Sequence, residues 1–292
     1  MENLLIIGCG DVARRALPEL QRRYRVTALV RSLDPVLDSA GVGQIAGDLD
    51  DAASLAPLAG RPGRIAHLAP PAGGGTLDTR TRSLLAALAP RGRGAMLPRR
   101  FVYFSTSGVY GDCAGEWIDE TRPPKPQTGR ALRRLDAERA LGDWGERNEV
   151  EIVILRVPGI YASDRLPLER LARGTPALRP DEDVYTNHIH ADDLAGILVA
   201  ALESTLARGA YNASDDGPMK MGDFFDLVAD RAGLARPPRI SREEAARLLP
   251  AELVSFMSES RRLSNRRMKA ELGVRLRYST VQDGVPGIKE TA

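Results

Sequence analysis

The stretch Asn3-Leu-Leu-Ile-Ile-Gly-Cys-Gly-Asp-Val-Ala13 places a short apolar run directly before a G-x-G-x-x-A turn. The continuous apolar run from Leu4 to Ile7 is typical of a strand that is buried on both faces of a parallel sheet. Apolar residues at helical spacing follow the turn, so the stretch predicts a strand, a tight turn and a helix. This order marks the entrance of a dinucleotide-binding fold.

Each small residue of this turn has a physical task. Gly8 permits a sharp reversal, Gly10 lets the backbone approach a pyrophosphate, and Ala13 lets the helix pack on the strand. The helix N-terminus directs free N–H groups and a positive partial charge at the phosphates. We therefore expect a cofactor to be bound by Gly8, Gly10, Asp11, Val12 and Ala13. A purely structural glycine turn is the alternative.

The composition is that of an ordinary globular protein. The 292 residues are 43% hydrophobic and 27% charged, which excludes disordered and fibrous classes. No apolar stretch approaches the roughly 18 residues that span a bilayer, and the N-terminus reads as a strand rather than a signal peptide. We expect a cytoplasmic protein without a membrane partner. Cys9 and Cys113 lack metal-like spacing and imply neither a disulfide framework nor a zinc site.

Acidic and basic residues nearly balance. The formal net charge is +2, so nothing indicates a nucleic-acid-binding protein. Arginine supplies all but four of the 41 basic residues. One local basic run is expected to be a solvated loop; it comprises Arg91, Arg93, Arg99 and Arg100.

Strand and helix patterns alternate through the first half of the chain. Strands are predicted near 3–7, 24–30, 44–46, 63–68, 100–105 and 150–155, and helices at 11–22, 51–58, 76–89 and 128–146. This alternation predicts an α/β fold with a Rossmann-type doubly wound parallel sheet. After Arg156 prolines interrupt the pattern, and helices are predicted at 192–202, 219–232, 243–249 and 262–272.

This change of pattern predicts two parts. Residues 1–156 with 191–209 are expected to form the dinucleotide-binding domain. Residues 157–190 with 210–292 are expected to form a smaller, irregular substrate-side portion. It should cover the carboxyl ends of the strands, where ligands bind in open α/β sheets.

The residues that follow the second strand bear on the choice of nucleotide. In an NAD site an acidic residue there binds the ribose 2′-hydroxyl, whereas here Val30 is followed by Arg31 and Ser32. Arg31 can pair with a 2′-phosphate through a forked, charge-assisted interaction, and Ser32 adds a donor. The sequence therefore favours NADP, with NAD as the alternative. Alternatively, Arg31 is only the first residue of a surface loop.

Four further segments carry a family resemblance. They are Gly47-Asp48-Leu49-Asp50-Asp51, His67-Leu68-Ala69-Pro70-Pro71, Phe104-Ser105-Thr106-Ser107-Gly108-Val109-Tyr110-Gly111-Asp112 and Asn187-His188-Ile189-His190-Ala191-Asp192-Asp193-Leu194-Ala195. In this order and spacing they resemble the extended and atypical branches of the short-chain dehydrogenase/reductase superfamily, specifically nucleotide-sugar epimerase-like proteins. The likeness covers most of the chain.

The resemblance implies positions for the cofactor and for catalysis. Asp48 and Leu49 look like the pair that flanks the adenine, and Ala69 and Pro70 look like the backbone beside a ribose. Thr106 matches the family's catalytic Ser/Thr and would also lie against the cofactor. Asp48 could instead cap the helix that starts near residue 51, and Thr106 could be a structural hydroxyl. The resemblance also implies a homodimer through the helices at 76–89 and 128–146, a packing that the arginine-rich face at 130–139 could oppose.

The chain departs from the family where a Tyr-x-x-x-Lys pair is expected. Arg130 occupies the tyrosine position and Arg134 the lysine position, one helical turn apart. Arginine stays protonated at any working pH, so Arg130 cannot shuttle a proton. Arg134 could still bind the ribose or phosphates, and the two arginines together could clamp a substrate anion. A solvated helix face is the alternative.

A proton donor would then come from another residue near the carboxyl edge of the sheet. Tyr110, Tyr161, His190 and Cys113 are the candidates, of which Tyr161 and His190 are preferred for catalysis and Tyr110 is expected beside the substrate. Structural roles are the alternative for each of them. We expect His188 and His190 to point to opposite faces of a strand, and we predict no metal site.

The sequence supports two functions. The first is an NADP-dependent reductase or epimerase-like enzyme that acts on a polar, anionic small molecule such as a nucleotide sugar. The second is a catalytically silent NAD(P)-binding sensor or assembly module, because the Tyr-x-x-x-Lys pair is replaced.

Overall fold

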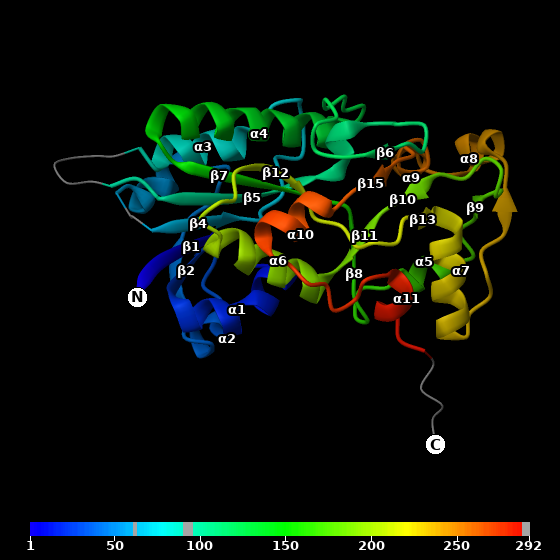
Figure 1. Cartoon of the computed structure of the whole chain (residues 1–292), viewed down its shortest axis with the longest axis horizontal. Coiled ribbons are helices and arrows are strands. Elements are labelled where there is room, and N and C mark those ends of the chain that lie inside the picture. The colour runs from blue at the N-terminus through cyan, green and yellow to red at the C-terminus, as the bar shows by residue number, and fades with distance from the viewer. Residues whose placement is uncertain (61–62, 90–95, 288–292) are drawn as a thin grey trace, which may run out of the picture.

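A seven-stranded parallel sheet forms the centre of the molecule (Figure 1). This computed structural model describes residues 1–60, 63–89 and 96–287. Across the sheet the strands are β12 (Gly209–Asn212), β7 (Glu151–Val157), β5 (Arg100–Thr106), β4 (Arg64–His67), β1 (Glu2–Ile7), β2 (Tyr24–Val30) and β3 (Gly43–Ala46). Every neighbouring pair is parallel. The predicted doubly wound fold is confirmed.

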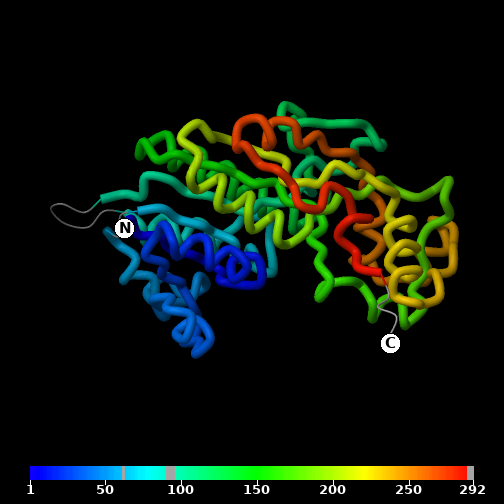
Figure 2. Tube along the Cα trace, turned by 60° about the horizontal axis from the view of Figure 1, so that its bottom comes forward, coloured from blue at the N-terminus to red at the C-terminus, as the bar shows by residue number. Residues whose placement is uncertain are grey.

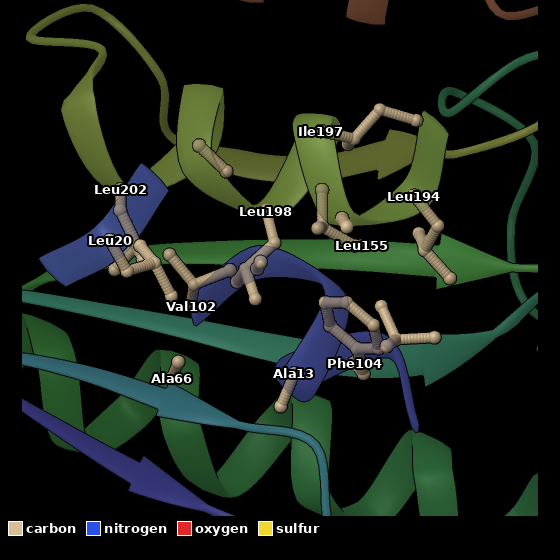
Figure 3. Close-up of a cluster of buried hydrophobic side chains, with 14 of the residues drawn as sticks. Ala13, Leu20, Ala66, Val102, Phe104, Leu155, Leu194, Ile197, Leu198 and Leu202 are labelled. Carbon is tan, nitrogen blue, oxygen red and sulfur yellow. The ribbon is translucent and has the colours of Figure 1, made fainter. Parts of the chain in front are cut away.

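Helices cover both faces of this sheet. One face packs against α1 (Asp11–Arg23), α6 (Ala191–Glu203) and α10 (Arg266–Leu272), and Figure 3 shows Leu194 and Leu198 of α6 over the strands that carry Val102 and Leu155. The other packs against η1 (Ala52–Leu58), α3 (Thr79–Ala87) and α4 (Gly129–Asn148). Because successive strand residues point to opposite faces, the continuous apolar run in β1 serves both layers. Leu4 and Ile6 face one layer, and Leu5 and Ile7 face the other.

The sequence predicted most of these elements but not all of them. The six predicted strands are present, whereas β12 was not anticipated, because four residues leave too short a pattern. The segment predicted as a helix at 51–58 is a 3₁₀ helix, and the short helix α2 (Pro35–Ser39) was not predicted. The predicted helix at 262–272 begins only at Arg266, because residues 262–263 form a strand.

The remaining segments gather at one end of the molecule, beyond the carboxyl ends of the sheet strands (Figures 1 and 2). Their helices are α5 (Leu168–Ala172), α7 (Met221–Ala232), α8 (Arg242–Leu248), α9 (Ala251–Phe256) and α11 (Val281–Gly284). Their strands form four two-stranded pairs: β6 (Trp117–Ile118) with β15 (Arg262–Leu263), β8 (Gly159–Tyr161) with β11 (His188–His190), β9 (Ala177–Leu178) with β14 (Arg239–Ile240), and β10 (Tyr185–Thr186) with β13 (Met219–Lys220). This portion therefore lies where a substrate-side part was expected.

The prediction of a solvated basic loop at 91–100 is wrong for Arg100. This residue begins β5, and its guanidinium pairs with Glu151 of the neighbouring strand at 2.6 Å. It also donates to the carbonyls of Ala201 and Ser204 at the end of α6, so the charge is buried but fully partnered. Arg99 is exposed, and Arg91 and Arg93 lie outside the described residues. No described helix is both long and apolar enough to cross a membrane.

Candidate functional site

The turn between β1 and α1 fits a pyrophosphate. Gly8 has a φ of +87°, and a Cβ there would lie 2.5 Å from the backbone nitrogen of Ala69. A Cβ at Gly10 would meet nothing within 4 Å. Helix α1 has no side-chain cap at its N-terminus, so its first N–H groups stay available for a ligand. Gly8 thus serves the fold, and Gly10 keeps the approach to the helix open.

A cavity of about 400 Å³ adjoins this turn at the carboxyl ends of β1, β2 and β4. It lies where the strand order reverses, since the chain runs from β1 outward to β3 and then returns to β4 on the other side. Its lining includes many residues that the sequence had assigned to the cofactor: Gly8, Arg31, Ser32, Asp48, Ala69 and Pro70. Asp51 rather than Asp48 caps η1, by accepting from the N–H of Ala53, so the capping alternative for Asp48 is wrong.

Three charged residues of this cavity were missed. Arg14 pairs with Asp34 at 2.5 Å, and Arg80 binds the Asp50 carboxylate and the carbonyls of Pro70 and Pro71. The Arg14 side chain lowers the pKa of Asp34 through their hydrogen bond. In a chain so rich in arginine, no spacing distinguishes these arginines from surface residues.

The other residues expected at the cofactor lie around the cavity rather than in its lining. Val12, Ala13 and Leu49 are buried in the two core layers. Asp11 accepts hydrogen bonds from Arg15 at 2.9 Å and from Arg165 at 2.8 Å. Its carboxylate therefore joins α1 to the segment that follows β8.

A second cavity, of about 310 Å³, lies at the carboxyl ends of β5 and β7. Because β5, β4 and β1 are neighbours in the sheet, this cavity continues the same edge as the first one. Thr106 lines it at the end of β5, where its Oγ1 accepts from the N–H of Gly108 at 3.2 Å. That bond uses a lone pair and leaves the hydroxyl proton free to be donated. Pro158 and Gly159 line the cavity at the carboxyl end of β7.

Arg130 and Arg134, which stand where the family has its tyrosine and lysine, have different surroundings. Arg130 is exposed, lines this second cavity and lies with its guanidinium 4.4 Å from the ring centre of Phe256. Arg134 instead donates to the Ala69 carbonyl at 3.2 Å and to the Tyr103 hydroxyl at 3.0 Å. The structure therefore directs only Arg130 into the cavity, while Arg134 holds the end of β4.

A buried polar network lies beneath Thr106. Arg156 of β7 pairs with Glu138 of α4 at 2.8 Å, and Glu138 also accepts from the Ser105 hydroxyl. The Tyr110 hydroxyl donates to Asn212 of β12 at 2.8 Å, and burial raises the pKa of Tyr110 to about 12. Tyr110 was expected beside the substrate, but it does not belong to the described lining of either cavity.

The preferred proton donors, Tyr161 and His190, also lie outside these two linings. Tyr161 is fully buried, and its hydroxyl donates to the Thr280 carbonyl at 3.1 Å. His190 caps α6 by accepting from the N–H of Asp192 at 3.1 Å, and burial lowers its pKa. Cys113 is buried too, and burial raises its pKa. Catalysis by Tyr161 or His190 stays a prediction that this geometry does not support.

The prediction that His188 and His190 point to opposite faces is wrong. Both rings make edge contacts with Tyr161, with centroid distances of 6.3 Å and 5.2 Å. Residues two apart on a strand share a face, which is why both rings meet the same tyrosine. Within the described residues no group of three His, Cys, Asp or Glu side chains could hold a metal ion.

The outer wall of the Thr106 cavity comes from segments far along the chain. Tyr185, Phe256, Glu259 and Arg261 line it together with Ser255 and Met221. None of these residues was singled out from the sequence, because no local motif surrounds them. Long-range contacts, among them the pairing of β6 with β15 and of β10 with β13, bring them over the sheet edge.

Comparisons with known proteins agree with this fold. A conserved protein of unknown function from Silicibacter pomeroyi DSS is 27% identical, with a TM-score of 0.76 and coverage of 97% of this chain and 96% of that chain. The UDP-glucose 4-epimerase of Thermus thermophilus, solved with NAD, is 23% identical, with a TM-score of 0.73 and coverage of 97% and 96%, and it supports the fold alone.

A curated relative from a Streptomyces species is named 3-diazoavenalumate denitrifying reductase. It is 27% identical over 175 residues, which are 58% of this chain and 55% of that protein, so the match spans about half of the relative's length. The model of the NAD dependent epimerase/dehydratase family matches residues 5–214. This match covers most of the chain, including the carboxyl ends of the strands at both cavities. The protein belongs to the NAD dependent epimerase/dehydratase family.

Proposed function

We propose that this protein is an NADP-dependent reductase or epimerase-like enzyme that acts on a polar, anionic small molecule. The observation that carries the proposal is the position of Thr106 and Arg130 in one cavity beside the dinucleotide cavity. A hydroxyl that can donate and a cation that can bind an anion thus meet at the sheet edge where the family holds its cofactor. A nucleotide sugar is one substrate of this kind.

The dinucleotide would be held by three parts of the first cavity. The N–H groups of α1 and the open side of Gly10 would take the pyrophosphate, and Asp48 would flank the adenine. Ala69 and Pro70 would lie beside a ribose. A bound nicotinamide dinucleotide supplies or accepts hydride.

The preference for NADP rests on charge at the end of β2. Arg31 and Ser32 line the cavity, while the nearby Asp34 carboxylate is already paired with Arg14. A guanidinium there attracts a 2′-phosphate, and the paired carboxylate does not offer itself to a 2′-hydroxyl. Binding titrations should give a lower Kd for NADPH than for NADH. A clearly lower Kd for NADH would contradict the preference.

In the second cavity, Arg130 would bind the anionic group of the substrate, and Thr106 would donate its hydroxyl proton to an oxygen at the reacting centre. Arg130 does not itself exchange a proton. The reductase name of the Streptomyces relative and the epimerase members of the family leave both reaction classes within the proposal.

A substrate panel tests the function. The protein is incubated with NADPH and a set of nucleotide sugars and small carbonyl compounds, with consumption of NADPH reporting reduction and nuclear magnetic resonance reporting isomerisation. We expect turnover of at least one anionic compound, and Thr106→Val should reduce kcat by about 10²- to 10⁴-fold without weakening NADPH binding. Absence of both reactions across the panel would contradict the proposal.

A second function is favoured by one observation. Arg134 is bonded to the β4 end, and no Tyr-x-x-x-Lys pair is present, so the usual acid of the family is missing. A silent NADP-binding sensor or assembly module would bind NADPH, gain thermal stability from it and show no turnover in the same panel.

A further inference from the structure

The Thr106 cavity carries an ion pair on its outer wall. The Glu259 and Arg261 side chains are 9% and 12% exposed. Nη1 of Arg261 donates to Glu259 Oε2 at 2.8 Å and to the Gly111 carbonyl at 2.7 Å. These two bonds fix the guanidinium against the loop that follows Tyr110.

This pair is incompletely hydrogen bonded. Among the described residues, neither Glu259 Oε1 nor Arg261 Nε has a hydrogen-bond partner, although both atoms are buried. The first is an acceptor and the second is a donor. An unpaired buried polar group costs about 1–3 kcal/mol, and native proteins tolerate it where a water or ligand completes the bonding.

The cavity wall beside the Glu259–Arg261 pair is weakly packed. Helix α9 supplies Ser255 and Phe256 to the cavity, yet none of its six residues is buried. A segment with so little buried surface moves at small energetic cost. Helix α9 is therefore the weakly packed part of the wall that lines the cavity with this ion pair.

The charge of the lining favours an anion. Its charged residues are Arg130, Arg261 and Glu259, which leave a net positive charge. Arg130 stacks on Phe256, and stacking leaves the N–H edge of a guanidinium available for a carboxylate or phosphate. The cavity thus offers an anion site beside a carboxylate oxygen that can accept from a hydroxyl.

We propose that Arg130 and Arg261 bind the anionic group of the substrate and that Glu259 Oε1 accepts a hydrogen bond from a neighbouring substrate hydroxyl. This assignment rests on the proposed function and narrows its substrate to a hydroxylated carboxylate or phosphate ester. Arg261 and Glu259 are specificity-determining residues in this scheme, and neither exchanges a proton with the substrate.

Four probes separate the two parts of this recognition. Calorimetric titrations of the NADPH-loaded protein use glucuronate, glucose 1-phosphate, glucose and acetate. We expect glucuronate or glucose 1-phosphate to bind about 10-fold or more tightly than both glucose, which lacks the anion, and acetate, which lacks the hydroxyl. The better of the two anionic sugars distinguishes a carboxylate from a phosphate site.

Single variants connect the binding to the named side chains. Arg130→Gln and Arg261→Gln should each weaken the better anionic sugar by about 10- to 100-fold, since each removes a charge-assisted hydrogen bond. Glu259→Gln should reduce the preference for glucuronate over acetate. Arg266→Gln removes the same charge from an exposed neighbour outside this cavity and should leave the Kd within about twofold.

Different results would contradict the recognition scheme and the proposed function. If NADPH binds but none of the four probes does, or if Arg130→Gln and Arg261→Gln bind like the parent protein, the recognition scheme is overturned. Arg130 is exposed on α4, so its variant tests the scheme even if Arg261→Gln folds poorly. The proposed function is judged separately, by turnover in the substrate panel.

Discussion

Two glycines of the β1–α1 turn have opposite surroundings, and this contrast separates folding from cofactor binding. Gly8 combines a φ of +87° with a Cβ position 2.5 Å from Ala69 N. We expect Gly8→Ala to lower the free energy of unfolding by about 2–4 kcal/mol, because both the backbone strain and the contact must be relieved. Urea denaturation monitored by circular dichroism measures this loss.

Gly10→Ala is the matched control. The backbone there has φ −84° and ψ −162°, which any residue adopts, and a Cβ meets nothing within 4 Å. Stability should change by less than about 0.5 kcal/mol. NADPH affinity should nevertheless fall by about 10-fold or more, because the methyl group stands where the pyrophosphate passes. Unchanged NADPH binding in Gly10→Ala would contradict the position assigned to the cofactor.

The charge of Arg31 can be tested in the same way. Arg31→Ala should raise the Kd for NADPH by about 10- to 100-fold and leave the Kd for NADH within about threefold, since only NADPH carries the 2′-phosphate. Arg25→Ala removes an exposed arginine near the opposite end of β2 and should affect neither. Fluorescence titration measures the Kd for both nucleotides. Equal losses of affinity for NADPH and NADH would show that Arg31 does not select between them.

For single residues, the sequence predicted the positions that local spacing determines. Gly8, Arg31 and Thr106 each follow a predicted strand directly, so their positions at the carboxyl edge were foreseeable. Glu259 and Arg261 lie about 150 residues after Thr106 in an irregular stretch. Their place in the cavity depends on long-range strand pairs that no local pattern reveals.

At the scale of elements, the ion pair between α4 and β7 supports the strand end that carries Thr106. Glu138 and Arg156 are 5% and 7% exposed at their side chains and lie 2.8 Å apart. Removal of one partner leaves the other charge buried without compensation. We expect Glu138→Met and Arg156→Met each to lower the free energy of unfolding by about 3–5 kcal/mol.

The double variant Glu138→Met/Arg156→Met should lose clearly less than the sum of the single losses, because no unpaired charge remains. Glu169→Met breaks the exposed pair with Arg173 on α5 and should change stability by less than about 1 kcal/mol. A double-mutant cycle from chemical denaturation gives these values. Additive losses would show that the pair is not coupled.

Elements also differ in how far their sequences specify them. Helix α4 is preceded by a capping threonine, Thr128, and followed by Glu149 in the left-handed conformation. These two residues bound a 20-residue helix that the sequence predicted closely. The paired strands beyond the carboxyl edge of the sheet have only two or three residues each. Such short runs have no measurable alternation, so only the folded partner defines them as strands.

Over the whole molecule, the irregular portion beyond the strand ends is joined to the Rossmann sheet by contacts between distant segments. Arg15 of α1 pairs with Asp164 at 2.7 Å and with Asp192 of α6 at 2.8 Å. Asp193 accepts from the N–H groups of Arg277 and Tyr278 near the C-terminal end. Asp193 therefore anchors the segment around residues 277–278 to the start of α6.

A buried carboxyl at this junction makes the stability of the whole molecule depend on pH. Asp215 follows β12 and is 3% exposed. Burial, with Asp216, Asp193 and Asp283 nearby, raises its pKa to about 8. The unfolded carboxyl ionises near pH 4, so folding must restore a proton between about pH 4 and 8. The contribution of the neutral carboxyl to stability is therefore complete below pH 4 and is lost as the pH rises through 8.

Asp215→Asn removes this dependence, because the amide stays neutral and its oxygen can still accept from the N–H of Gly217, as Asp215 Oδ1 does at 3.2 Å. We expect the variant and the parent protein to have similar Tm values near pH 4.5. Above pH 8 the variant should be the more stable of the two by a few kcal/mol, since it avoids a buried charge among other carboxylates. Thermal unfolding from pH 4.5 to 9 measures the difference, and a constant gap across that range would show that Asp215 is already ionised in the folded protein.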